Sequence, residues 1–150
     1  MVDLESALII ILLASASVGW LTSFYFHRVH HQKSQEAVWW MPRMLQMMDC
    51  RCDEIVESSF GSTFGRSNAF WGLWYYPALG LTVLSSNTLG IPDTGVLFII
   101  VLLAFAYSIY LAWGLYLLKV ACRPCFGAHV INSIVFLILL YRAYPLLVNS

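Results

Sequence analysis

Four apolar blocks alternate with polar segments along the chain. They cover residues 7–26, 69–84, 94–118 and 126–141, and none contains Asp, Glu, Lys or Arg. A helix needs roughly 20 apolar residues to cross the hydrocarbon core of a bilayer. The first and third blocks reach this length. The second reaches it when extended to residue 89, and the fourth when it begins at Cys122. The pattern therefore predicts four transmembrane helices.

Composition supports a membrane protein over a soluble one. Hydrophobic residues make up 60% of the 150 residues and charged residues only 11%, which is too apolar for an ordinary soluble domain. In lipid, helices satisfy every backbone polar group within one segment. We expect an all-α membrane protein, a four-helix bundle in a single domain over residues 1–150. The acidic start "MVDLES" and the long apolar run after it favour a retained first helix over a signal peptide.

The connections between these helices differ greatly in length. Residues 27–67 form the one long connection, residues 86–93 form a short turn, and residues 119–121 join the last two helices directly. With four spans, the long connection and the last junction lie at the same membrane face. All four cysteines, Cys50, Cys52, Cys122 and Cys125, are therefore predicted to lie at that face.

The long connection contains the apolar stretch "EAVWWMPRMLQMM". Six of its residues recur at helical spacing: Ala37, Trp40, Met41, Met44, Leu45 and Met48. This spacing predicts a short interfacial helix between the first two spans. The helix is either a lid over a site or a loop helix that rests on the bilayer.

A stripe of polar residues enters the fourth span. Cys122, Cys125, His129 and Asn132 are separated by steps of three, four and three, and such steps keep side chains on one helix face. Polar and ionisable groups within a bilayer are costly and mark functional sites. The alternative for His129 is a packing role.

The Cys122-x-x-Cys125 pair opens the fourth helix. Pro124 indicates a first turn, because proline is tolerated best there. A helix N-terminus and the neighbouring Arg123 favour a thiolate. The spacing is typical of a dithiol/disulfide redox centre. The alternatives are a purely structural disulfide or a pair of inert buried thiols.

The long connection and the second span add further candidates. Only one residue separates Cys50 from Cys52, so a disulfide between them is expected to be strained and easily reduced, as suits a shuttle pair. Asn68, Gly72 and Tyr76 follow at steps of four and form a second stripe. The alternative role for Asn68 is that of a helix N-cap.

Together these residues resemble the vitamin K epoxide reductase family, which includes bacterial and archaeal disulfide-forming enzymes. The resemblance covers most of residues 50–144. It rests on a loop cysteine followed by "DEIVESSFGSTFG", on "NAFWGLWYY" opening the second helix, and on the CxxC followed by "INSIVF". The order and spacing of these segments are specific, whereas a CxxC alone is not.

The resemblance implies a thiol oxidoreductase that generates disulfides by an electron relay. A separate thioredoxin-like dithiol protein exchanges with the loop cysteines, and electrons pass to the CxxC and then to a quinone, ubiquinone or menaquinone. Cys52 resembles the loop cysteine that bonds transiently to Cys122, and Cys50 resembles the partner-facing thiol. Cys125 resembles the thiolate that reduces the quinone. The resemblance also implies a quinone site formed by Asn68, Phe60 and His129. The expected partners are lipid, quinone and the dithiol protein, with no nucleic acid.

Two departures from the family pattern bear on the chemistry. The animal enzymes carry Tyr where this chain has His129, although an imidazole can also donate to a quinone oxygen. The loop cysteines are usually farther apart than Cys50 and Cys52. The departure at His129 counts against the animal epoxide reductase activity. The resemblance nevertheless implies, as an alternative function, an epoxide or quinone reductase acting on a vitamin K-type substrate.

A second alternative belongs to another class, a soft-metal-binding membrane protein. "HRVHH", the methionines of residues 41–48 and Cys-x-Cys contain ligand types that Cu(I) prefers. The methionines also fit an apolar helix face. Our assignment of site residues includes no metal ligand.

The distribution of charged residues and the family resemblance predict opposite orientations of the protein in the membrane. Seven Lys and Arg residues fall on the cysteine face and only Arg142 on the other, so the positive-inside rule places the cysteines in the cytoplasm. Most of the family faces an oxidising compartment. Both orientations of this multi-pass membrane protein stay open.

Overall fold

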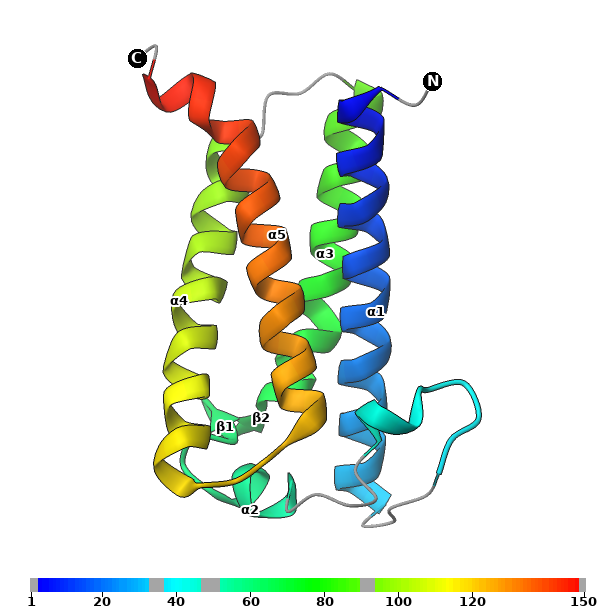
Figure 1. Cartoon of the computed structure of the whole chain (residues 1–150), viewed down its shortest axis with the longest axis vertical. Coiled ribbons are helices and arrows are strands. Elements are labelled where there is room, and N and C mark those ends of the chain that lie inside the picture. Colours follow the sequence, from blue (N-terminus) through cyan, green and yellow to red (C-terminus); the bar gives the residue numbers. More distant parts are fainter. Residues whose placement is uncertain (1–2, 33–36, 47–51, 90–93, 149–150) are drawn as a thin grey trace.

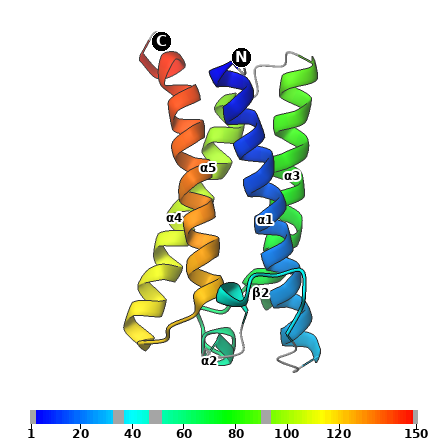
Figure 2. The same ribbon diagram turned by 45° about the vertical axis from the view of Figure 1, so that its right-hand side comes forward.

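Four long helices run side by side along the whole length of the molecule (Figures 1 and 2). The computed structural model describes residues 3–32, 37–46, 52–89 and 94–148. The long helices are α1 (Leu4–Gln32), α3 (Asn68–Leu89), α4 (Thr94–Leu118) and α5 (Arg123–Val148). Helix α1 packs against α3 and α5, and α4 packs against α5. The predicted helical bundle is confirmed.

Three of these helices are long and apolar enough to cross a membrane. The spans are Leu4–Val29 in α1, Gly95–Leu118 in α4 and Arg123–Tyr144 in α5. Large apolar side chains such as Leu103, Trp113 and Leu137 point outward and are 58–65% exposed. An exposed apolar surface of this kind marks contact with lipid or protein. Helix α3 does not meet the same criterion within the described residues, and it contains Pro77 and a serine-containing last turn.

Two apolar clusters hold the bundle together. One lies between the long helices and includes Leu12, Val101, Val135 and Leu139, all 1% exposed or less. The other joins the cysteine end of the bundle to the α1–α3 connection, and contains Tyr25, Met41, Cys52, Ile55, Val120 and Cys122, among others. The second cluster therefore fixes that connection against the start of α5.

The second half of the α1–α3 connection forms a small cap across one end of the bundle (Figure 1). We call residues 52–67 the cap. It consists of α2 (Cys52–Glu57) and a hairpin of β1 (Ser62–Thr63) and β2 (Arg66–Ser67). The strands pair antiparallel, with Ser62 opposite Ser67. Phe64 and Gly65 have φ of 52° and 74°, and two-residue hairpin turns of type I′ require positive φ at both positions. The sequence analysis predicted neither α2 nor the hairpin.

The predicted interfacial helix is wrong over residues 37–46. That segment forms turns and a single 3₁₀ turn, η1 (Arg43–Leu45). Pro42 explains the difference, because proline lacks an N–H and disfavours helical geometry in the residue before it. The Gln46 side-chain amide instead donates to the carbonyls of Val38 and Met41 at 2.7 and 2.8 Å. Met48, on the same predicted face, lies outside the described residues.

Candidate active site

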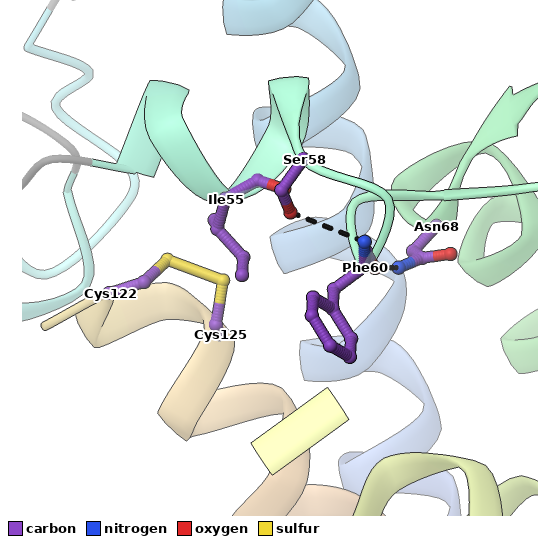
Figure 3. The surroundings of a disulfide bond; sticks show 6 residues. All are labelled: Ile55, Ser58, Phe60, Asn68, Cys122 and Cys125. Atoms are coloured by element: carbon purple, nitrogen blue, oxygen red, sulfur yellow. Dashed lines mark hydrogen bonds between the residues drawn. A yellow bond between two sulfur atoms is a disulfide. The ribbon is translucent and has the colours of Figure 1, made fainter. Parts of the chain in front are cut away.

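A disulfide joins Cys122 and Cys125 at the start of α5, with their Cα atoms 5.3 Å apart (Figure 3). The first helical residue is Arg123, and the carbonyl of Cys122 accepts a hydrogen bond from the Phe126 N–H at 3.0 Å. Cys122 therefore occupies the N-cap position, and Pro124 lies in the first turn, as predicted. The Cys122 side chain is buried within the second apolar cluster.

The cap brings a second cysteine to the same place. Cys52, the first residue of α2, is fully buried and disulfide-bonded. It belongs to the same apolar cluster as Cys122, and Cys125 packs against that cluster. Ile55, one turn further along α2, points toward Cys125 (Figure 3). The fold thus brings the loop cysteine and the CxxC together. Cys50 lies outside the described residues.

A cavity of about 360 Å³ lies beside the disulfide and between the long helices. Its walls include Cys125, His129 and Asn132 from α5, and also Asn68, Gly72 and Tyr76 from α3. The structure therefore brings the two predicted stripes to one space. The other predicted pocket residue, Phe60, also lines it, whereas Cys122 does not. The volume is typical of a small-molecule site.

The cavity suits an uncharged, largely apolar ligand. No Asp, Glu, Lys or Arg of the described residues lines it. The part of the chain that the structure describes also contains no group of three or more His, Cys, Asp or Glu residues that could hold a metal ion. Several ligands of the metal hypothesis, including Cys50 and Met48, lie outside that part.

Asn68 uses its side chain to hold the cap. Its amide nitrogen donates to the Phe60 carbonyl at 2.6 Å, and its Oδ1 accepts from the hydroxyls of Thr63 and Tyr107 at 2.8 and 3.0 Å. The Thr63 and Tyr107 hydroxyls also contact each other. The alternative role of N-cap is wrong for Asn68, because Ser67 Oγ accepts from the Phe70 N–H at 3.3 Å and caps α3. Asn68 therefore links α3, the cap and α4.

Phe60 is the aromatic contact between the cap and α4. Its ring lies 5.3 Å from that of Tyr110. It also lies directly over Gly114, where an added Cβ would come within 2.6 Å of Phe60 Cδ1. Only glycine at this position lets the ring approach the α4 backbone so closely. The Phe60 N–H donates to Ser58 Oγ at 3.2 Å (Figure 3).

His129 has one satisfied and one unsatisfied ring nitrogen. Nδ1 lies 2.6 Å from Ser108 Oγ on α4, whereas Nε2 is buried and has no hydrogen-bond partner within the described structure. The hydroxyl of Tyr75, another cavity residue, is also buried without a partner there. By contrast, the Tyr76 hydroxyl donates to Asn132 Oδ1 at 3.0 Å. Two buried polar groups at one cavity, His129 Nε2 and the Tyr75 hydroxyl, therefore have no hydrogen-bond partner among the described residues.

Sequence reasoning missed Ser108, Tyr107 and Tyr75. Ser108 and Tyr107 are polar residues within an otherwise apolar membrane block, and this was the available signal. Which face of that block points inward could not be determined, because nearly every position in it is apolar.

The model of the vitamin K epoxide reductase family matches residues 10–140 of the chain. The chain belongs to the vitamin K epoxide reductase family. The match extends across most of the bundle and the whole cap. Comparisons with curated proteins and with solved structures gave no match.

Membership in the vitamin K epoxide reductase family makes the protein an integral membrane oxidoreductase. Members of this family use quinones as electron partners. The disulfide at the N-terminus of α5 joins the two cysteines of a CxxC motif, and the uncharged cavity lies directly beside it.

Proposed function

We propose that the protein oxidises dithiols to disulfides and passes the two electrons and two protons to a quinone, which becomes a quinol. The dithiol belongs to a separate thioredoxin-like protein. The quinone is ubiquinone or menaquinone and reaches the site from the lipid. In this proposal α3 crosses the membrane as well, so that all four long helices are spans. The whole chain is a single catalytic domain.

The relay proceeds through two thiol–disulfide exchanges. The dithiol partner attacks the loop disulfide of Cys50 and Cys52 and leaves oxidised, so both loop cysteines become thiols. Cys52 then attacks Cys122, which forms a bond between them and releases Cys125 as a thiolate. Cys50 closes the loop disulfide again and releases Cys122. Electrons have thus moved from the partner to the CxxC with every bond accounted for.

The final step takes place at the cavity wall. Cys125, which lines the cavity, delivers the electron pair to the quinone, and the Cys122–Cys125 disulfide forms again. His129 donates a hydrogen bond to a quinone oxygen, Asn68 supplies a second contact through its remaining N–H, and Phe60 covers the ring. The uncharged walls give the quinone ring apolar surroundings.

The observation that carries this proposal is the position of the disulfide between two different surroundings. On one side lies the buried Cys52 of the cap, and on the other lies the uncharged cavity. A purely structural disulfide needs neither neighbour. An electron relay between protein thiols and a lipid-soluble acceptor needs both.

The proposal is tested by mixing purified protein in lipid nanodiscs with a reduced thioredoxin-like protein and a short-chain quinone. We expect loss of the quinone absorbance, with one substrate disulfide formed for each quinone consumed. Protein carrying Cys122→Ser is the matched control and should be inactive. No quinone consumption by the wild-type protein with several dithiol partners and both quinone types would refute the proposal.

A further inference from the structure

Ser108 differs from several other serine and threonine residues of the long helices. In five of them the hydroxyl donates to the carbonyl four residues earlier, at 2.8–2.9 Å; these residues are Ser17, Thr22, Thr82, Ser86 and Ser133. Such a bond is the usual arrangement for Ser and Thr within a helix. Within the described residues, the hydroxyl of Ser108 contacts His129 Nδ1 instead, at 2.6 Å.

The position of Ser108 determines where its proton points. The residue is only 4% exposed, so water does not compete for the hydroxyl. A hydroxyl carries a single proton, and a buried proton of this kind is directed to an acceptor. Within the described structure the acceptor in reach is His129 Nδ1. Nδ1 therefore accepts, and the neutral ring carries its proton on Nε2.

This tautomer explains the unsatisfied nitrogen. His129 Nε2 is buried without a partner among the described residues, although His129 lines the cavity. A buried N–H without an acceptor is costly, so such groups in native proteins commonly serve a ligand. The other tautomer would present a lone pair at Nε2, and a lone pair repels a quinone oxygen.

We propose that Ser108 is a positioning residue that holds His129 in the Nε2–H tautomer, so that the ring can donate to an oxygen of the quinone. The identity of the ligand in this proposal rests on the proposed function. The tautomer of His129, by contrast, can be measured without any enzymatic activity. Ser108 acts through His129 and across the α4–α5 interface. Helix α4 also contributes Tyr107 to the walls of the same cavity.

The tautomer can be measured directly by NMR. Protein labelled with ¹⁵N-histidine is prepared in nanodiscs at about pH 8, where neutral histidine predominates, and His129→Phe identifies the signals of His129. We expect Nε2 to be protonated in the wild-type protein and Nδ1–H to become populated in Ser108→Ala. Protonation at Nδ1 in the wild-type protein, or an unchanged tautomer in Ser108→Ala, would overturn the proposal.

Kinetic measurements then test whether the tautomer of His129 affects the rate of quinone reduction. Ser108→Ala should slow quinone reduction several-fold, while exchange between the loop cysteines and the dithiol protein keeps its rate. Ser108→Thr retains a hydroxyl and should restore both the tautomer and most of the rate. Ser133→Ala is the matched control, because Ser133 bonds to the backbone carbonyl of His129 and not to its ring. It should change neither measurement.

Two results separate this proposal from the proposed function. If Ser108→Ala shifts the tautomer but leaves quinone reduction unchanged, the positioning role is overturned and the proposed function stands. If the wild-type protein reduces no quinone but Ser108→Ala still shifts the tautomer, the proposed function fails and the assignment of the His129 proton is upheld.

Discussion

At the scale of single residues, the polar groups of the cavity are of two kinds: those that bond to other protein groups, and those without such a partner among the described residues. The side chains of Asn68 and Tyr76 form hydrogen bonds with other protein groups, so these residues stabilise the fold around the cavity. His129 Nε2 and the Tyr75 hydroxyl have no partner in the described part of the chain. A ligand oxygen that meets either group therefore need not break a protein hydrogen bond first.

His129→Phe tests the donor at the residue scale. A hydrogen bond to the quinone becomes stronger as its oxygen gains negative charge, and this difference lowers the barrier. Loss of one such donor costs roughly 10²–10³ in rate at well-studied oxyanion sites. We expect a loss of about tenfold here, because water can partly replace the donor in a half-open site.

The measurement compares quinone reduction with thiol exchange in the same preparation. Exchange with the dithiol protein should keep its rate in His129→Phe, and His129→Tyr should regain much of the quinone rate because a phenol can donate from the same place. An unchanged quinone rate together with a lower melting temperature would identify His129 as a packing residue.

Cys125→Ser tests the order of the relay. In Cys125→Ser, the Cys122 thiolate should attack Cys52 in the loop disulfide and release Cys50 as a thiolate. Because no Cys125 is present to attack the new bond, Cys122 should remain disulfide-bonded to the cap through Cys52, which belongs to the same buried cluster. Peptide mapping under non-reducing conditions detects this bond. Cys122→Ser, the matched variant, should show no bond between the cap and α5. A Cys50–Cys122 bond would show that the roles of the two loop cysteines are exchanged.

At the scale of elements, the cap is held on the bundle by a buried apolar cluster and by specific side-chain contacts. The Asn68 side chain ties it to α3 and α4, and the Phe60 ring packs against α4 at Gly114. Under the proposed function, the cap must move for a partner protein to reach the buried cysteines.

Gly114→Ala tests this packing. The new methyl would lie 2.6 and 2.7 Å from two atoms of the Phe60 ring, so the ring must shift. Overpacking of this kind costs about 1–3 kcal/mol, and thermal unfolding should detect a lower melting temperature. In a protein that already carries Phe60→Ala, Gly114→Ala should lower the melting temperature much less, because the clash with the ring is then absent.

Gly80→Ala is the control for that experiment. Its methyl would lie 3.8 Å from Ala16 Cβ, an ordinary contact, and alanine stabilises a helix by about 0.5–1 kcal/mol relative to glycine. Its melting temperature should therefore stay the same or rise. Equal losses in Gly80→Ala and Gly114→Ala would contradict a specific role for the Phe60 contact.

The long elements were predictable from the sequence because uninterrupted apolar blocks define them. The block 94–118 coincides with α4, and the CxxC with Pro124 indicated the start of α5. The cap was not predictable, because α2 and the hairpin are short and depend on contacts with distant residues. The predicted interfacial helix does not form, because Pro42 interrupts the segment whose apolar spacing indicated it.

The site was predictable where polar residues recur at helical spacing on otherwise apolar helices. This condition holds for Cys125, His129 and Asn132 on α5, and for Asn68 and Tyr76 on α3. It fails for Ser108, whose role depends on which face of α4 meets α5. It also fails for the hydrogen bonds of Asn68, which join residues that are distant in sequence.

At the scale of the whole molecule, the two ends differ in charge. Among the described residues, the end that carries the cap includes Arg28, Arg43, Arg66, Lys119 and Arg123. At the other end, Arg142 pairs with Glu5 at 3.4 Å. The positive-inside rule counts such residues near the ends of spans, and it predicts that the cysteine end faces the cytoplasm.

Thiol labelling of intact cells tests this orientation. After treatment with a membrane-permeant reductant, a membrane-impermeant maleimide should leave the cysteines unmodified until the cells are permeabilised. A variant with a single new cysteine in place of Val148, which is 62% exposed at the far end of α5, serves as the control for the opposite face and should react at once. Labelling of the native cysteines in intact cells would place the site outside, as in most of the family.

The two disulfides also set how many electrons the resting protein can store. No described cysteine is free, because Cys122 is bonded to Cys125 and Cys52 is held in a separate disulfide. Each disulfide accepts two electrons, so under the proposed relay the oxidised enzyme has a capacity of four. Two substrate dithiols can then be oxidised in a rapid burst before any quinone arrives. Under the proposed relay, the enzyme therefore continues to oxidise its dithiol partner for two turnovers after quinone is withdrawn.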